Sequence, residues 1–176
     1  MAALIGVDEA TAENVAATRR NAGGALWVAN LNAPGQIVVS GGSDDIVWVA
    51  ENGRDLGVRR AIPLKVAGAF HSPYMETAAD ELAAALSATH FAPPRFPVYA
   101  NATAAPVGDV ATNLGEQLVN PVRFAATLEA MATAGVDTFV HVGPGDVTAG
   151  MVKRTVPDAS VLVVSVLDDI PPVAEA

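Results

Sequence analysis

The amino-acid sequence predicts an α/β protein built in two parts. Apolar, strand-like runs alternate with helix-period segments along the chain, and Gly, Pro and Asn turn signals separate them. Hydrophobic residues make up 51% of the 176 residues and charged residues only 16%, a core-rich composition unlike that of disordered chains. Residues 1–66 show the order β-α-β-β-α-β, which is that of the ferredoxin-like fold.

The first part opens with a strand and a helix. Residues 2–7 are apolar and suit a buried strand. Asp8 has the side chain of a helix N-cap, and we expect its helix to end near Asn21, where Gly23 and Gly24 stop it.

Two further strands are expected at residues 25–32 and 36–41. Pro34 and Gly35 lie between them and mark a turn. The two runs therefore predict neighbouring strands.

A second helix and a fourth strand complete the first part. We expect Ser43 to cap this helix and Gly57 to close it. Residues 59–68 are then extended, and Pro63 within them indicates a bulge or a sheet edge.

The second part, residues 67–168, predicts strands that alternate with helices and hence a parallel sheet. A sheet of three strands would leave a face or an edge uncovered. Residues 169–176 form a tail that we expect to be frayed. The expected elements are a helix from Pro73 to about Thr89, a strand at 96–101, helices at 114–119 and about 124–131, a strand at 137–145, a helix at 147–154 and a strand at 160–166.

Composition argues against several classes of protein. There are no cysteines, which excludes disulfides, thiolate zinc sites and a cysteine nucleophile. The net charge is −9 and no basic stripe is present, so we expect no nucleic-acid binding. No apolar run approaches the roughly 20 residues that cross a bilayer, and no signal peptide opens the chain. We therefore expect a cytoplasmic protein with no membrane contact.

His71, in the stretch AGAFHSPYM, is the best single candidate for a catalytic group. Histidine is the usual general base near neutral pH, but a lone histidine is more often a packed or exposed bystander. His90 and His141 suit that second reading, and no histidine pair has metal-ligand spacing, so no metal site is expected. No serine of the chain lies in a G-x-S-x-G elbow, so a base at this position would have no nucleophile here.

Five stretches of the chain carry a family resemblance. They occur in the order MAALIG, NLNAPGQIVVSGG, RRAIPLKVAGAFHSPYM, EQLVNPVRF and DTFVHVGPGDVTAGMVKR. Together they closely resemble the malonyl-CoA:acyl carrier protein transacylases of fatty-acid synthesis and the acyltransferase domains of polyketide synthases. The resemblance spans residues 1–168.

The resemblance implies how the two parts fit a larger architecture. Family members insert a ferredoxin-like small subdomain into a large α/β-hydrolase-like subdomain. Residues 1–66 would be the small subdomain, residues 67–168 the C-terminal part of the large one, and 169–176 a flexible tail. We accordingly expect this chain to be a C-terminal portion that lacks the serine-bearing segment, the oxyanion loop and the malonate-binding arginine.

The resemblance also implies an activity. Family members transfer a malonyl group from malonyl-CoA to the phosphopantetheine thiol of an acyl carrier protein through a seryl acyl-enzyme. Malonyl-CoA and the thiol are substrates, and no permanently bound cofactor is implied. We expect this chain alone to be inactive, and to pair with the missing N-terminal segment or with itself. The alternatives are a non-catalytic remnant that binds CoA or acyl carrier protein, and a serine hydrolase with a related core.

Two residues match the family's catalytic histidine site. His71 matches the histidine of the Ser-His dyad, which takes the proton of the serine and returns it to the leaving thiol. Gln117 matches the residue whose backbone carbonyl orients that imidazole.

Four residues match positions that contact substrate in the family. Asn30, Asn32 and Gln36 match polar positions of the substrate channel, although turn chemistry alone explains the stretch that begins at Asn32 equally well. Phe70 matches a position where phenylalanine accompanies malonyl selection, because its ring fills the space that an α-methyl branch would need. Phe70 could equally be a hydrophobic staple onto the next helix.

Overall fold

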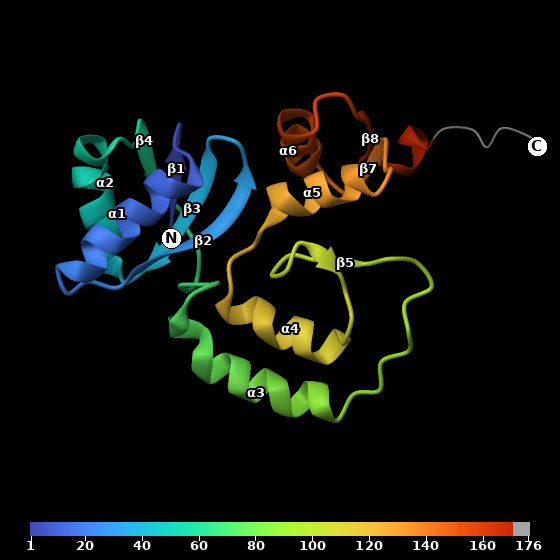
Figure 1. The fold of residues 1–176 in the computed structure, drawn as a ribbon, viewed down its shortest axis with the longest axis horizontal. Helices are drawn as coiled ribbons and strands as arrows, with labels where there is room; N and C mark the ends of the chain where they lie inside the picture. Colours follow the sequence, from blue (N-terminus) through green and yellow to red (C-terminus); the bar gives the residue numbers. More distant parts are fainter. Residues whose placement is uncertain (171–176) are drawn as a thin grey trace, which may run out of the picture. The chain divides into compact units, whose positions relative to one another are not determined.

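The computed structural model describes residues 1–170 (Figure 1). By its internal contacts the chain divides into two compact units, Met1–Thr127 and a second that begins at Leu128. The boundary expected after residue 66 lies inside the first of these units, in which Val122 forms backbone hydrogen bonds with Ala29 and Leu31.

The first unit contains a four-stranded antiparallel sheet in the order β2-β3-β1-β4. This is the arrangement that the β-α-β-β-α-β order predicts, and it confirms the ferredoxin-like part. Its elements are β1 (Ala2–Ile5), α1 (Glu9–Asn21), β2 (Leu26–Ala33), β3 (Gln36–Gly41), α2 (Ser43–Asn52) and β4 (Arg60–Pro63).

The core of this unit lies between the sheet and its two helices. Strand residues alternate, so Ala2 and Leu4 of β1 are fully buried while the residues between and after them are partly exposed. Val15 of α1 and Val49 of α2 are also fully buried in the same cluster. The buried residues of the strands, which recur every second position, therefore pack against the buried residues of the helices, which recur about every 3.6 positions.

Three residues were predicted to begin or end helices of this unit. Asp8 caps α1 as predicted, since its carboxylate accepts a hydrogen bond from the Thr11 N–H at 2.8 Å. Gly57 has a φ of 89° and closes the 3-10 helix η1 (Gly53–Leu56) that follows α2. The prediction that Ser43 caps α2 is wrong: Gly42 is the N-cap and makes no side-chain hydrogen bond.

After β4 the first unit continues with two helices and a small hairpin. The predicted strand at 96–101 is reduced to two residues, which pair antiparallel with β6 and not with a parallel neighbour. Pro97 cannot donate to a strand ladder, and Phe96 and Val98 stay exposed. The elements are η2 (Pro73–Met75), α3 (Glu76–Ser87), β5 (Tyr99–Ala100), β6 (Ala105–Pro106) and α4 (Val110–Val119).

Helix α4 begins four residues earlier than expected, because Asp109 caps it by accepting from the Thr112 N–H. Helix α5 (Phe124–Thr133) follows and leads from the first unit into the second.

In the second unit two parallel strands, β7 (Thr138–Val142) and β8 (Ser160–Val164), are joined by α6 (Val147–Thr155). The strand-helix-strand order is as predicted. Exposed residues alternate with partly buried ones along most of both strands.

The chain after β8 forms the short 3-10 helix η3 (Leu167–Asp169), in which the Asp169 carboxylate accepts from the backbone N–H groups of Ser165 and Val166. Asp169, where the predicted tail begins, is therefore part of a 3-10 helix, and residues 171–176 of that tail lie outside the described residues. Within the described part of the chain, no helix is long and apolar enough to cross a membrane.

Candidate active site

His71 lies in the loop between β4 and η2, and its backbone is unusual. Its φ is 57°, in the left-handed region that favours glycine. A non-glycine residue there costs about 1–2 kcal/mol. Such strain persists only where the surroundings hold it, so the contacts of His71 are informative.

The C-terminal turn of α4 holds both the backbone and the ring of His71. The backbone N–H donates to the carbonyl of Leu118 at 3.1 Å. The ring atom Nδ1 lies 2.9 Å from the carbonyl oxygen of Gln117. Carbonyls at the end of a helix lack intrahelical partners, so α4 offers acceptors where His71 needs them.

This geometry selects one tautomer of the imidazole. A carbonyl can only accept, so Nδ1 carries the proton and Nε2 is left as the basic nitrogen. The side-chain amide nitrogen of Gln117 also lies 3.4 Å from Nδ1, and it could donate only to the opposite tautomer. We assign the carbonyl contact, because it is shorter by half an ångström and falls at the usual hydrogen-bond length.

With Nδ1 engaged by the helix-end carbonyl, His71 is placed to accept a proton at Nε2.

Strand β2 fixes the turn that follows α4. The Val122 N–H donates to the Ala29 carbonyl and the Leu31 N–H donates to the Val122 carbonyl, each at 2.8 Å. Asn30 and Val122 form a parallel bridge at this point. The carbonyls that hold His71 are therefore anchored to the sheet.

An aromatic contact connects the other side of the His71 loop to the same strand. Tyr74 of η2 and Trp27 of β2 pack edge to face, with ring centroids 5.7 Å apart and an angle of 88° between the ring planes. Strand β2 thus contacts both the segment that follows His71 and the turn that follows α4.

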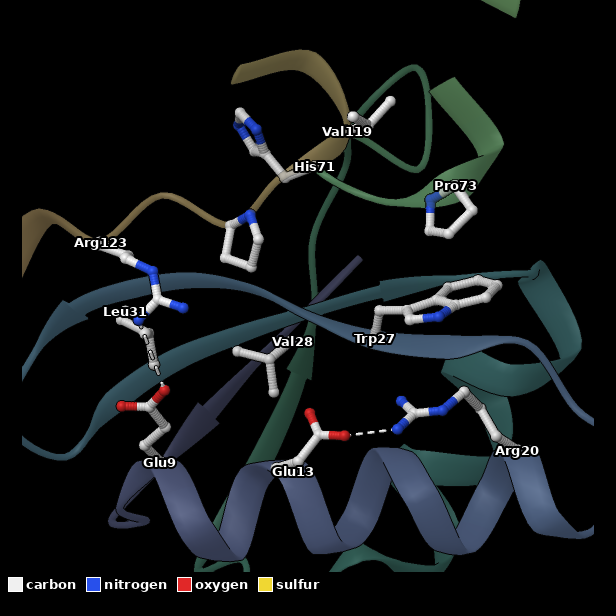
Figure 2. Close-up of a pocket in the computed structure, with 11 residues that line it drawn as sticks. Glu9, Glu13, Arg20, Trp27, Val28, Leu31, His71, Pro73, Val119 and Arg123 are labelled. Carbon is white, nitrogen blue, oxygen red and sulfur yellow. Dashed lines mark hydrogen bonds and ion pairs between the residues drawn. The ribbon is translucent and has the colours of Figure 1, made fainter. Parts of the chain in front are cut away.

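A pocket of about 300 Å³ lies beside His71, along β2 and across from α1 (Figure 2). Its lining combines apolar residues with a charged rim. Its lining includes His71, Trp27, Val28, Glu9, Glu13, Arg20 and Arg123.

The charges at the rim of this pocket are paired. Arg20 forms an ion pair with Glu13 and also donates to the Leu26 carbonyl at 2.7 Å. Arg123 lies 4.0 Å from the carboxylate of Glu9 (Figure 2). Because each cation faces a carboxylate, the rim offers a nearly neutral, partly apolar entrance and no strong phosphate site.

The structure brings together only part of the predicted site. His71 and Gln117 meet as described. Phe70 is 38% exposed, packs close to Gly68 and does not line the pocket. The polar residues expected in the substrate channel, Asn30 and Asn32 on β2 and Gln36 at the start of β3, do not line it either.

Sequence reasoning did not anticipate the α1 side of the pocket. Glu9, Glu13 and Arg20 are spaced by four and seven residues, which places them on one stripe of the helix. That spacing was visible in the sequence, but nothing local indicated what the stripe would face.

The other histidines do not enter this site. His141 makes a hydrogen bond through Nδ1 to the Thr148 hydroxyl within the second unit. Among the described residues, no group of three His, Asp or Glu side chains could hold a metal ion.

The site thus consists of a histidine that is held by a helix-end carbonyl, beside a pocket and next to a ferredoxin-like sheet. Residues 3–171 match the model of the acyl transferase domain family. The chain therefore belongs to that family.

Characterised relatives carry a consistent name. The chain is 38% identical over 157 residues to the malonyl CoA-acyl carrier protein transacylase of Bacillus subtilis (strain 168), covering 88% of this chain and 50% of that protein. It is 32% identical over 173 residues to the Staphylococcus aureus (strain COL) protein of the same name, covering 97% and 56%.

Solved structures agree. The fold resembles a malonyl-transacylase in complex with a type II polyketide acyl carrier protein, with a TM-score of 0.90, 30% identity, and 96% of this chain and 55% of that one covered. It also resembles the acyl-carrier-protein S-malonyltransferase of Bartonella henselae, with a TM-score of 0.89, 32% identity and coverage of 96% and 54%. The chain spans about half the length of these relatives.

Proposed function

We propose that this chain supplies the histidine half of a Ser-His site that transfers malonyl groups from malonyl-CoA to the phosphopantetheine thiol of an acyl carrier protein. The observation that carries the proposal is the His71 ring, whose Nδ1–H donates to the Gln117 carbonyl and whose Nε2 is thereby left basic. The names of the relatives support the substrate and the acceptor.

The chemistry assigned to His71 is a proton shuttle. Nε2 takes the proton of a serine hydroxyl as the serine oxygen attacks the thioester carbonyl of malonyl-CoA, and it gives that proton to the departing CoA sulfur. In the second half His71 takes the proton of the carrier thiol, whose sulfur attacks the acyl-serine, and returns it to the serine oxygen. No oxidant and no bound cofactor enter this cycle.

The nearly neutral rim of the pocket indicates which part of malonyl-CoA the pocket would bind. Arg20 and Arg123 are already paired with carboxylates, so phosphate groups of CoA would gain little there. An uncharged pantetheine arm suits the apolar lining beside His71 better. Asn30, Asn32 and Gln36 remain proposed contacts of the substrate channel.

Phe70 is the proposed selector for malonyl over branched acyl groups, by the space that its ring occupies. Since CoA thioesters and carrier proteins are intracellular compounds, we also propose a cytoplasmic location. The pathway served is fatty-acid or polyketide synthesis, by the names of the relatives.

A chimera tests the proposal. The part of the Bacillus subtilis transacylase that lies outside the matched region is joined to this chain, and transfer of radiolabelled malonyl from malonyl-CoA to a carrier protein is measured. We expect transfer by the chimera, and a loss of roughly 10³-fold or more in its His71→Ala variant, as for a lost catalytic base.

The unjoined chain is the matched control. Without a serine nucleophile aligned to His71, we expect no stable malonyl label on it above a His71→Ala background. A folded chimera that only hydrolyses malonyl-CoA would support a hydrolase instead, and a folded chimera that neither binds nor turns over malonyl-CoA would contradict the proposal outright.

A further inference from the structure

Ser72 is a buried polar residue to which the proposed proton shuttle gives no role. Its side chain is 0% exposed. Its hydroxyl donates to the carbonyl of Ala69 at 2.6 Å, three residues back along the chain. The bond therefore spans the segment that contains Phe70 and His71.

This hydrogen bond closes a small ring around the strained residue. His71 has a φ of 57°, and Ser72 directly after it is extended, with φ −146° and ψ 166°. The chain bends at these two residues. The hydrogen bond from Ser72 to Ala69 joins the two ends of that bend.

Ser72 does not cap the helix that follows it. It occupies the N-cap position of η2 but makes no side-chain bond to the helix N–H groups. Its hydroxyl points back to Ala69 instead, although serine at such a position commonly serves the helix that follows. The hydroxyl therefore serves the loop before it.

We propose that Ser72 is a positioning residue for His71. Its hydroxyl holds the loop in the conformation from which the His71 N–H reaches Leu118 and the ring reaches Gln117. The inference rests on the proposed function, because the orientation of the ring matters for transfer only if His71 is the base.

The test reads the imidazole directly and needs no acyl transfer. Long-range ¹H–¹⁵N spectra of this chain report which ring nitrogen of His71 carries the proton. We expect a single tautomer, protonated at Nδ1, in the parent and a mixture of tautomers in Ser72→Ala. The Nδ1 proton should exchange with water roughly tenfold faster in the variant, the factor expected when about one hydrogen bond is lost.

The chain offers a matched control. The Ser87 hydroxyl also donates to the carbonyl three residues back, Ala84, at 2.8 Å, but it is exposed and lies in α3. Ser87→Ala should leave the His71 resonances unchanged. Ser72→Cys, which keeps nearly the same volume and donates only weakly, should shift them in the direction of Ser72→Ala.

The outcomes separate cleanly. A single unchanged His71 tautomer in folded Ser72→Ala and Ser72→Cys would overturn the proposal. Unfolding of both variants would overturn it too, since Ser72 would then support the fold as a whole. A chimera without malonyl transfer whose His71 resonances still respond to Ser72 would leave this inference intact and refute only the proposed function.

Discussion

At the scale of single residues, two non-glycine positions within residues 1–170 hold a left-handed backbone, and they differ in what holds them. His71, with φ 57°, is fixed by hydrogen bonds to α4. Ala104, with φ 54°, lies in the turn of the β5–β6 hairpin, where its N–H donates to the Ala100 carbonyl at 2.9 Å. The left-handed backbone at His71 accompanies a fixed position of the imidazole ring, whereas the one at Ala104 belongs only to the hairpin turn.

Ala104→Gly should therefore stabilise the protein. Glycine removes a strain of about 1–2 kcal/mol but adds freedom to the unfolded chain, which leaves a gain of roughly 0.5–1 kcal/mol in the free energy of unfolding. Urea unfolding measures this. Ala102→Gly, in the same turn without a positive φ, should destabilise instead, and a destabilised Ala104→Gly would show that the turn is not strained.

Phe70→Ser tests the selector proposed for malonyl. In the active chimera, the ratio of methylmalonyl to malonyl transfer should rise by roughly 10–200-fold if the ring excludes an α-methyl branch. Competition between the two labelled thioesters gives the ratio. Because Phe70 does not line the pocket beside His71, an unchanged ratio would leave it only a packing role.

At the scale of elements, two helices depend on carboxylate caps. Thr11, through its side chain and then its backbone N–H, holds the pKa of Asp8 below its ordinary value of 3.8. Thr112 does the same for the pKa of Asp109 at the start of α4. A carboxyl whose pKa is lowered on folding stabilises the folded state above its unfolded pKa, and that contribution is lost as the pH falls through the folded value.

Asp8→Asn should remove this acid sensitivity at α1. Asparagine still accepts the hydrogen bond of the cap but does not titrate. The parent should be the more stable protein well above pH 3.8, and the difference should shrink well below it. Urea midpoints of both proteins at the two conditions check this, and a difference independent of pH would contradict the assigned cause.

Elements also show what sequence reasoning can and cannot reach. The cap at Asp8 was predictable because a few neighbouring residues determine it, whereas Gly57, expected to close α2, closes the 3-10 helix η1 after it. The strand at 96–101 was not, since its apolar residues are equally compatible with an exposed hairpin. Gln117 was placed beside His71 only by resemblance, because a backbone carbonyl leaves no trace in residue type.

At the scale of the whole molecule, one face of the β7–β8 pair remains uncovered. Val140 is 52% exposed and Val142 77%, and Leu162, opposite Val140 in the ladder, is 45% exposed. Apolar residues that share one face of a sheet favour association more than scattered ones do. We infer that this face makes the isolated chain associate.

Val140→Thr combined with Val142→Lys should reduce that association. Sedimentation velocity over a range of concentrations should show a smaller shift toward larger species than in the parent. Val47→Lys is the matched control, because Val47 of α2 is 54% exposed and belongs to the first unit. Equal association of all three proteins would locate the contact elsewhere.

The bridge between Asn30 and Val122 has a second consequence, for aggregation. Strand β2 is the outer strand of its sheet, where unpaired N–H and C=O groups can recruit a strand from another molecule. Val122 occupies two of those groups, on Ala29 and Leu31. The turn after α4, which orients the imidazole, thus also covers part of the edge strand of the sheet. Loosening this turn would weaken the site and leave the chain prone to form intermolecular β-structure.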